Sequence, residues 1–125
     1  MLLLDAGAFL AVERHDRDVI ALIKSELIAN RAPKTHGGIV AQVWRGGAGR
    51  QAQLARLLPG VDVVPVDAEL GRSAGMLLKA AHAVDAIDAA LVALASDGDD
   101  ILTSDVDDLR SLAAAAGVQV ELITV

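Results

Sequence analysis

Three aspartates lie inside or directly after otherwise apolar segments of the chain. Asp5 follows an apolar run at the N-terminus, and Asp105 follows a second apolar run near residue 102. Asp88 lies within the apolar stretch IDAALVALA. A carboxylate in apolar surroundings is costly unless another group compensates its charge. Hard cations such as Mg²⁺ and Mn²⁺ prefer oxygen ligands, commonly carboxylates with water and phosphate oxygens, so a cluster of these three residues predicts a divalent-metal site.

Each aspartate also has an ordinary structural interpretation when it is taken alone. An aspartate before a helix commonly caps that helix, which would explain Asp85 and Asp107, and an aspartate at a strand end is often a turn residue. Asp88 fits neither role because it lies within the apolar segment, and this favours the metal-site interpretation. Asp85 lies three residues before Asp88 on the same helix face, so the sequence leaves open which of the two faces the site.

Strands and helices are expected to alternate from one end of the chain to the other. The predicted strands cover residues 1–4, 33–36, 61–66, 101–103 and 118–125. The predicted helices cover residues 16–30, 37–45, 50–58, 67–80, 85–95 and 107–116. This alternation predicts an α/β fold with a parallel sheet, right-handed crossovers and helices on both faces. The segment directly after Asp5 is expected to form a turn.

The predicted sheet would bring the aspartates to one of its edges. In an open parallel sheet, a site lies beyond the carboxyl ends of the strands, near the point where the strand order reverses. Asp5 and Asp105 each lie at the end of a predicted strand, and Asp88 lies near the start of the helix that precedes the second of these strands. The length of 125 residues fits one domain, which we assign to residues 1–125.

Composition restricts the class of protein. The chain has no cysteine, which excludes disulfides and thiolate metal sites and fits a reducing cytoplasm. Phe9 and Trp44 are the only aromatic residues, so the core must be aliphatic. Asp5 interrupts the N-terminal apolar run, which argues against a signal peptide, and no apolar stretch reaches the roughly 18 residues of a membrane span. We therefore expect a cytoplasmic protein without a membrane role.

The charge of the chain bears on its partners. The formal net charge is −6, so a nucleic-acid partner would require a local arginine patch or a bridging metal, and a basic protein partner is equally compatible. Arg45, Arg50 and Arg56 form the only basic cluster. Arg45 is the residue expected to contact the phosphates of a nucleic acid, although ordinary surface charge explains all three arginines as well.

Several other functional classes lack their sequence signatures. No phosphate-binding G-x-x-x-x-G-K-[ST] loop is present, and the glycines of 46–49 follow a predicted helix instead of a strand. A phospho-acceptor receiver domain would need a lysine after the last strand, where none occurs. His15, His36 and His82 are scattered without helical spacing, so none of them is assigned as a metal ligand.

Three segments together resemble the PIN-domain family, and within it the VapC-type toxins of bacterial toxin–antitoxin pairs. The segments are LLLDAGAFLAVER with Asp5, VDAIDAALVALA with Asp88, and ILTSDVDDLRSL with Asp105. Their order and spacing match the family over the whole chain. The resemblance implies a five-stranded parallel sheet flanked by helices on both faces, and an acidic site that binds Mg²⁺ or Mn²⁺ and hydrolyses RNA. It also implies a homodimer and a VapB-type antitoxin that places a peptide in the acidic pocket.

The resemblance assigns roles to individual residues. Asp5, Asp88 and Asp105 match the family's first, third and fourth acids and are the expected metal ligands and catalytic residues. Asp108 matches an acid often found near the pocket, and Asp85 has counterparts in some members. Ser104 is expected to hold a water or orient Asp105, as is Thr103, although both could equally cap the following helix.

One position departs from the family pattern. The family's second acid is usually a glutamate in a stretch resembling A-E-V-W-R, where this chain has Ala41–Arg45 with Gln42. A glutamine keeps an oxygen acceptor but carries no charge, so it can orient a water or weakly ligate a metal and cannot act as a base. Weaker metal binding and slower cleavage are expected, unless Gln42 is only a polar surface residue.

Two hypotheses from different classes follow. The first is a metal-dependent endoribonuclease toxin of VapC type, in which Asp5 and Asp88 are the principal ligands and Asp105 completes the site. The second is a catalytically weak or inactive PIN-like module that binds a partner protein. The RNA target, the number of metal ions and the identity of the antitoxin are left open by the sequence.

Overall fold

The computed structural model describes residues 1–125 and contains strands and helices in alternation. The strands are β1 Leu2–Leu4, β2 Lys34–His36, β3 Asp62–Val64, β4 Asp100–Thr103 and β5 Glu121–Thr124. The helices are α1 Ala6–Glu13, α2 Arg17–Ile28, α3 Gly37–Val43, α4 Ala52–Leu57, α5 Ala68–Ala81, α6 Ala86–Ala93 and α7 Val106–Ala116. Short 3₁₀ turns at Gly49–Gln51 and Leu58–Gly60 flank α4.

The strands form one parallel sheet in the order β3-β2-β1-β4-β5. The chain moves outward from β1 through β2 to β3, then crosses to β4 on the other side of β1 and continues to β5. The strand order therefore reverses between β1 and β4, which is where an open parallel sheet places its site. The predicted five-stranded parallel sheet is confirmed.

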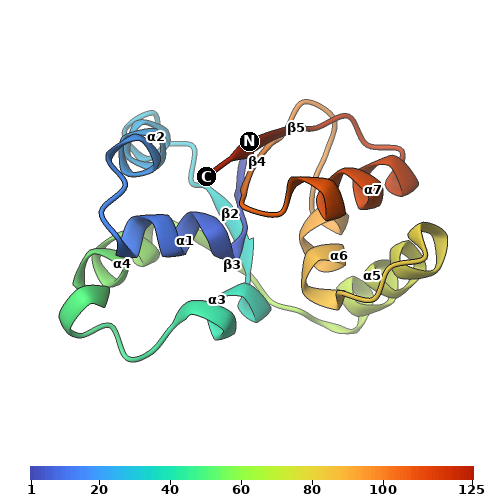
Figure 1. Cartoon of the computed structure of the whole chain (residues 1–125), viewed down its shortest axis with the longest axis horizontal. Coiled ribbons are helices and arrows are strands. Elements are labelled where there is room, and N and C mark those ends of the chain that lie inside the picture. The colour runs from blue at the N-terminus through green and yellow to red at the C-terminus, as the bar shows by residue number, and fades with distance from the viewer.

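Helices cover both faces of the sheet (Figure 1). Helices α1 to α4 belong to the connections made while the chain moves outward to β3, and they lie on one side. Helices α5 to α7 belong to the connections made after the reversal, and they lie on the other side. This division follows from crossovers of one handedness that run in opposite directions along the sheet.

The core is aliphatic, as the composition predicts. Strands β1 and β4 are buried along nearly their whole length, and the largest fully buried side chains include Phe9, Leu3, Leu4, Ile101 and Leu102. Central parallel strands are covered on both faces, so they consist of continuous apolar residues. The aspartates that follow these strands are therefore attached to the most deeply buried strands of the sheet.

Helix α1 corrects one prediction. The segment after Asp5 was expected to be a turn, but Ala6–Glu13 is helical and five of its residues are buried. Its buried and exposed positions do not form a simple apolar stripe, so helical periodicity is weak in the sequence. Asp5 occupies the N-cap position and its side chain accepts a hydrogen bond from the Ala6 backbone N–H, which is a local start signal for the helix.

The boundaries of most elements also differ from prediction, by one to three residues. The last strand is shorter than 118–125, because Gly117 ends α7 in a left-handed conformation and the following residues form a loop before Glu121. Helix α7 begins at Val106, one residue earlier than predicted, with Asp105 in the N-cap position. None of the helices combines the length and apolarity required to cross a bilayer.

Candidate metal centre

Asp5 links the end of β1 to the start of α1. It is buried, at 5% exposure, directly after the central strand. Its Oδ1 accepts from the Ala6 N–H at 2.7 Å, and its Oδ2 accepts from the Thr103 hydroxyl at 2.7 Å. Two donors thus fix the orientation of the carboxylate while each oxygen retains a free lone pair for a further ligand.

Thr103 connects the first and last of the predicted ligands. It is the final residue of β4 and is fully buried. While its hydroxyl donates to Asp5, the same oxygen accepts from the Asp105 backbone N–H at 2.9 Å. The Asp105 carboxylate makes no capping hydrogen bond to α7. Thr103 therefore holds the Asp105 backbone and leaves the Asp105 side chain available to the site.

Asp88 is the acid on helix α6 that faces the interior. It lies in the first turn of α6 and is 7% exposed. Asp85 is exposed and caps α6, with its Oδ1 accepting from the backbone N–H groups of Ile87 and Asp88 at 2.9 and 3.1 Å. Of these two acids, Asp88 is the buried one, and Asp85 caps the helix from an exposed position.

Asp108 joins the site from the first turn of α7. Ligand atoms of Asp88, Asp105 and Asp108 all lie within 4.8 Å of one another. Asp108 lies three residues after Asp105, a spacing that places two side chains on the same face at a helix start. The carboxylate oxygens of Asp5 are not among this group of three. Asp108, which the sequence gave only an accessory role, therefore sits closer to the centre of the site than expected.

The electrostatics of the cluster agree with its geometry. Burial raises the pKa of Asp88 to about 7, and the negative charges of four neighbours add to the effect. The neighbours are Asp5, Asp85, Asp105 and Asp108. Among these four charges, that of Asp5 contributes most to the raised pKa of Asp88. Asp5 therefore lies near Asp88, although its oxygens are not within the group formed by Asp88, Asp105 and Asp108. Carboxylates that repel one another in this way are the groups whose charge a bound cation would balance.

Asp105 and Asp108 interact directly. Burial raises the pKa of Asp105, followed in importance by a side-chain hydrogen bond with Asp108 and by the charges of Asp108, Asp5 and Asp85. Carboxyl groups whose pKa values are raised bind protons more readily, and a metal ion that ligates them competes with those protons.

A small pocket opens beside the cluster. It has a volume of about 270 Å³ and is lined on its acidic side by Asp85, Asp88 and Asp108. Its other wall comes from the loop after α5 and includes His82. The buried Asp88 therefore borders a pocket that opens to solvent.

Comparisons with known proteins identify the fold. No protein-family model and no curated protein matches the sequence. The solved structure of VapBC2 from Rickettsia felis, bound to a DNA fragment from their promoter, contains a chain similar at TM-score 0.70 and 12% identity. The alignment covers 98% of this chain and 98% of that one. The structure of FitAB bound to an IR36 DNA fragment is similar at TM-score 0.64 and 19% identity, over 98% of this chain and 94% of that one.

This chain has a PIN-like fold of VapC type. At these identities the similarity concerns the fold. Within the PIN-like fold, Asp5 and Asp105 follow the two strands that flank the reversal of strand order, and Asp88 approaches from α6. The acidic residues predicted from sequence are thus brought to one edge of the sheet.

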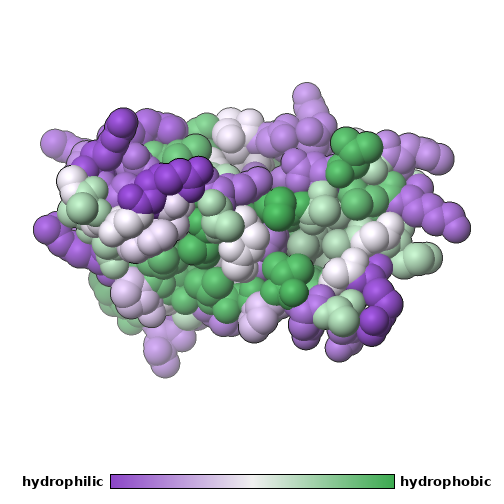
Figure 2. All heavy atoms as spheres, turned by 90° about the horizontal axis from the view of Figure 1, so that it is seen from below, coloured by the Kyte–Doolittle hydropathy of each residue, from purple (hydrophilic) through white to green (hydrophobic).

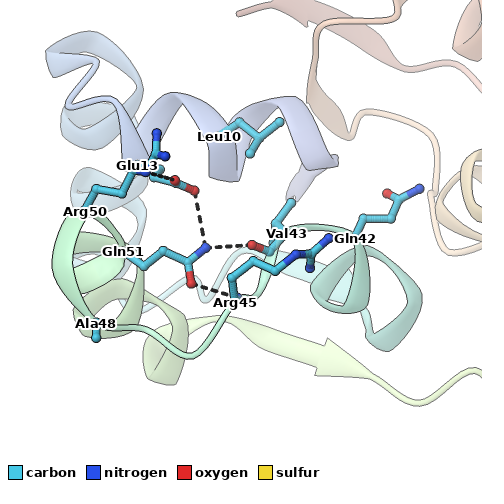
Figure 3. Close-up of a pocket in the computed structure, with 8 residues that line it drawn as sticks. All are labelled: Leu10, Glu13, Gln42, Val43, Arg45, Ala48, Arg50 and Gln51. Carbon is cyan, nitrogen blue, oxygen red and sulfur yellow. Dashed lines mark hydrogen bonds and ion pairs between the residues drawn. The ribbon is translucent and has the colours of Figure 1, made fainter.

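Gln42 lines a cleft whose lining includes none of the aspartates. It is exposed near the end of α3, and no hydrogen bond connects it to any aspartate. The cleft has a volume of about 430 Å³ and is also lined by Leu10, Glu13, Arg45 and Arg50. In Figure 3 the Gln42 amide points away from the hydrogen-bond network of this cleft.

That network is organised by Gln51, which the sequence did not reveal. Gln51 is 4% exposed, and its Oε1 accepts from the backbone N–H groups of Arg45 and Gly47 at 2.8 and 3.1 Å. Its Nε2 donates to the Val43 carbonyl at 2.7 Å and to Glu13 at 3.4 Å (Figure 3). One side chain therefore fixes the loop that carries Arg45, the residue predicted to contact RNA.

The arginines of this cleft are only partly engaged. The Arg45 guanidinium donates to the carbonyls of Ala41 and Trp44, and Arg50 lies 3.7 Å from the Glu13 carboxylate. Both arginines are exposed. Weak, solvent-exposed pairs of this kind leave the positive charge available to an anionic partner.

Ser104 lies where α1 approaches the β4–α7 connection. A Cβ atom at Gly7 would lie 2.6 Å from the Ser104 Oγ and 2.9 Å from its backbone nitrogen. Only glycine permits this approach of α1 to the loop before Asp105. The exposed Ser104 hydroxyl thus borders the acidic edge, and the role predicted for it in holding a water stays a prediction.

Proposed function

We propose that this chain is a metal-dependent endoribonuclease toxin of VapC type that hydrolyses RNA phosphodiester bonds. The observation that carries the proposal is the convergence of Asp88, Asp105 and Asp108 within 4.8 Å at the point where the strand order reverses. The PIN-like fold supports it, because the acids occupy the edge where this fold places its chemistry.

The donor set fits a hard divalent cation. Three carboxylates supply oxygen atoms, and no histidine or cysteine belongs to the group. The pKa values of Asp88 and Asp105 are raised. Mg²⁺ and Mn²⁺ favour such oxygen ligands and leave positions for water and substrate oxygens. When bound, the ion would lower the pKa of a water and stabilise the charge that develops at phosphorus.

The residues of the chain would share the remaining work. Asp5, Asp88 and Asp105 are the proposed metal ligands and catalytic residues, and Asp108 joins them because of its position. Asp5 is held by Thr103 and by the start of α1, so it would present its charge without rearrangement. Ser104 would orient a water beside Asp105, and Gln42 would act as a neutral acceptor for a water or the substrate.

RNA would reach the acidic edge with help from positive charge. The chain carries a net charge of −6, so its attraction for phosphates must be local. Arg45 and Arg50 line the cleft that also contains Gln42, and both are exposed. We assign Arg45 as an RNA phosphate contact on this basis.

The proposed partners are a VapB-type antitoxin and a second copy of the chain. The similar chains come from the structures of VapBC2 and FitAB, each bound to a DNA fragment. The molecule seen from below Figure 1 shows apolar surface across its centre (Figure 2). Exposed large apolar side chains include Leu10, Met76 and Val84. Apolar surface of this kind supports binding of another protein. We place the proposed complex with the antitoxin in the cytoplasm.

A second function is favoured by one specific observation. Gln42 carries no charge and forms no hydrogen bond with the acidic group, so the site has one acid fewer than the family pattern. A catalytically weak or inactive PIN-like module that binds a protein partner would have the same fold and the same apolar surface. RNA cleavage separates the two functions.

The decisive experiment compares RNA cleavage by the wild type, Asp5→Asn and Gln42→Glu in Mg²⁺ or Mn²⁺. The nuclease proposal expects wild-type cleavage that EDTA abolishes and that Asp5→Asn reduces by at least about 100-fold. Unchanged cleavage by Asp5→Asn would refute the assignment of the site. If only Gln42→Glu cleaves RNA, the natural chain is the binding module.

A further inference from the structure

We propose that Thr35 and His36 are a pair of positioning residues that set the spacing between Asp5 and Asp88. They are the last two residues of β2, and both are fully buried. Each forms a hydrogen bond to the carbonyl oxygen of the residue that directly precedes an acid. The inference rests on the proposed metal site and extends it to residues outside the acidic cluster.

Thr35 connects β2 to the end of β1. Its hydroxyl donates to the Leu4 carbonyl at 2.8 Å, in a fully buried contact. Leu4 is the last residue of β1 and is followed by Asp5. This side-chain bond supplements the pairing of the two strands, whose register aligns Leu3 with Lys34. The Thr35 bond therefore holds the backbone at Leu4, the residue directly before Asp5.

His36 connects the same strand end to α6. Its Nδ1 accepts from the Gly38 backbone N–H at 3.1 Å, so this nitrogen carries no proton. The neutral ring then carries its proton on Nε2, which donates to the Ile87 carbonyl at 2.9 Å. Ile87 directly precedes Asp88 in the first turn of α6. The geometry thus fixes the tautomer and uses both ring nitrogens.

Gly38 allows the end of β2 and the first turn of α6 to come this close. A Cβ atom at Gly38 would lie 2.7 Å from the Ile87 Cδ1 and 3.0 Å from the His36 Cε1. A side chain at this position would therefore force the Ile87 side chain to shift and would crowd the His36 ring. The glycine and the histidine act in the same direction, since one removes an obstacle and the other supplies the bond.

The pair spans elements that the sheet alone does not connect. β1, which directly precedes Asp5, is a neighbour of β2 in the sheet, whereas α6 precedes β4, which lies on the other side of β1. His36 adds a directed bond from the end of β2 to the turn that contains Asp88. Partners that orient metal ligands from behind commonly change metal affinity by about 10- to 100-fold when they are removed.

Two substitutions separate this role from helix capping. His36→Asn keeps an acceptor for the Gly38 N–H, since asparagine is a good N-cap, but it is too short to reach the Ile87 carbonyl. His36→Gln places an amide nitrogen where Nε2 lies and can donate to Ile87, but it loses the Nδ1 acceptor. Each variant retains one of the two bonds, and thermal unfolding shows whether each is folded.

The test measures Mn²⁺ affinity by titration calorimetry and amide hydrogen exchange in the first turn of α6 without metal. We expect His36→Asn to weaken Mn²⁺ binding about 10-fold and to accelerate exchange at Ala89, and His36→Gln to remain within about threefold of the wild type in both measurements. Equal effects of the two variants, or a greater effect of His36→Gln, would overturn the proposal.

Thr35→Val and Thr35→Ser provide the matched pair for the other bond. Valine removes the hydroxyl and serine keeps it, so only Thr35→Val should weaken Mn²⁺ binding, by a similar factor. If the wild type binds Mn²⁺ but does not cleave RNA, the proposed function fails while this inference is still decided by affinity. If the wild type binds no Mn²⁺, hydrogen exchange at α6 in the two His36 variants decides it.

Discussion

The Thr103 hydroxyl donates a hydrogen bond of 2.7 Å to the Asp5 carboxylate across the boundary where the strand order reverses. The two residues are 98 positions apart in the chain; Thr103 is the last residue of β4, and Asp5 directly follows the neighbouring strand β1. Because the Thr103 hydroxyl oxygen also accepts from the Asp105 N–H, one side chain is hydrogen-bonded to two of the proposed ligands. The acidic edge is therefore built on the central strands.

Thr103→Val should destabilise the fold and weaken metal binding. Valine has a similar shape but cannot donate, so the buried Asp5 would lose a partner, which costs about 1–3 kcal/mol of unfolding free energy. Urea unfolding and Mn²⁺ titration measure the two effects. Thr103→Ser is the control, since it keeps the hydroxyl and should retain most of the wild-type metal affinity. Wild-type unfolding free energy in Thr103→Val would contradict the importance of this bond.

Asp88→Asn should stabilise the metal-free protein at alkaline pH. The folded-state pKa of Asp88 is raised to about 7, whereas an unfolded aspartate titrates near about 3.9. Between these values the folded state holds a proton that the unfolded state has lost, so the wild type loses stability as pH rises through this window. Above the folded pKa the loss is complete and constant, and below about pH 4 it vanishes.

Thermal unfolding in EDTA measures this effect. Asparagine is neutral at every pH, so Asp88→Asn should unfold roughly 3–5 °C above the wild type at pH 8, and the difference should shrink toward pH 4. The raised pKa of Asp105 acts in the same direction on the wild type. A lower unfolding temperature for Asp88→Asn at pH 8 would show that its buried carboxylate is compensated in some other way.

The sequence predicted the central part of this arrangement for physical reasons that are local. Apolar runs ending in aspartate marked β1 and β4, and parallel strands bring their carboxyl ends to one edge, so Asp5 and Asp105 could be placed without a structure. Asp88 was recognised because a charge in an apolar helix requires compensation. Each inference needed only the residue and its immediate neighbours.

The parts that the sequence did not predict depend on contacts between distant segments. Helix α1 is buried on most sides and therefore has no clear amphipathic period. The bonds of Thr35 to Leu4 and of His36 to Ile87 connect residues 31 and 51 positions apart, and neither residue type indicates its partner. In the sequence, His36 is one of three scattered histidines without an assigned role. Its contact with α6 is visible only in the fold.

Metal affinity should rise with pH up to about neutrality. Asp88 and Asp105 both have raised pKa values, so a metal ion must displace protons from the cluster at acidic pH. Displacement of one proton predicts about a tenfold gain in affinity for each pH unit below the pKa of about 7, and little change above it. Mn²⁺ calorimetry between pH 5.5 and pH 8 in buffers of different ionisation enthalpy, about six conditions in all, also counts the released protons. An affinity independent of pH would place the metal elsewhere.

Asp108 and Asp107 offer a comparison between adjacent residues of one helix turn. Asp108 belongs to the group within 4.8 Å, whereas Asp107 forms an exposed pair with Arg110 at 3.1 Å. Asp108→Asn removes a negative charge and a ligand, so we expect Mn²⁺ affinity to fall by about 10-fold or more, with a corresponding loss of metal-induced stabilisation. Asp107→Asn removes the same charge one residue away and should change affinity by less than about twofold, because exposed charges are screened by solvent. Equal weakening by both variants would mean that net charge, and not ligation by Asp108, determines how well the cluster holds a cation.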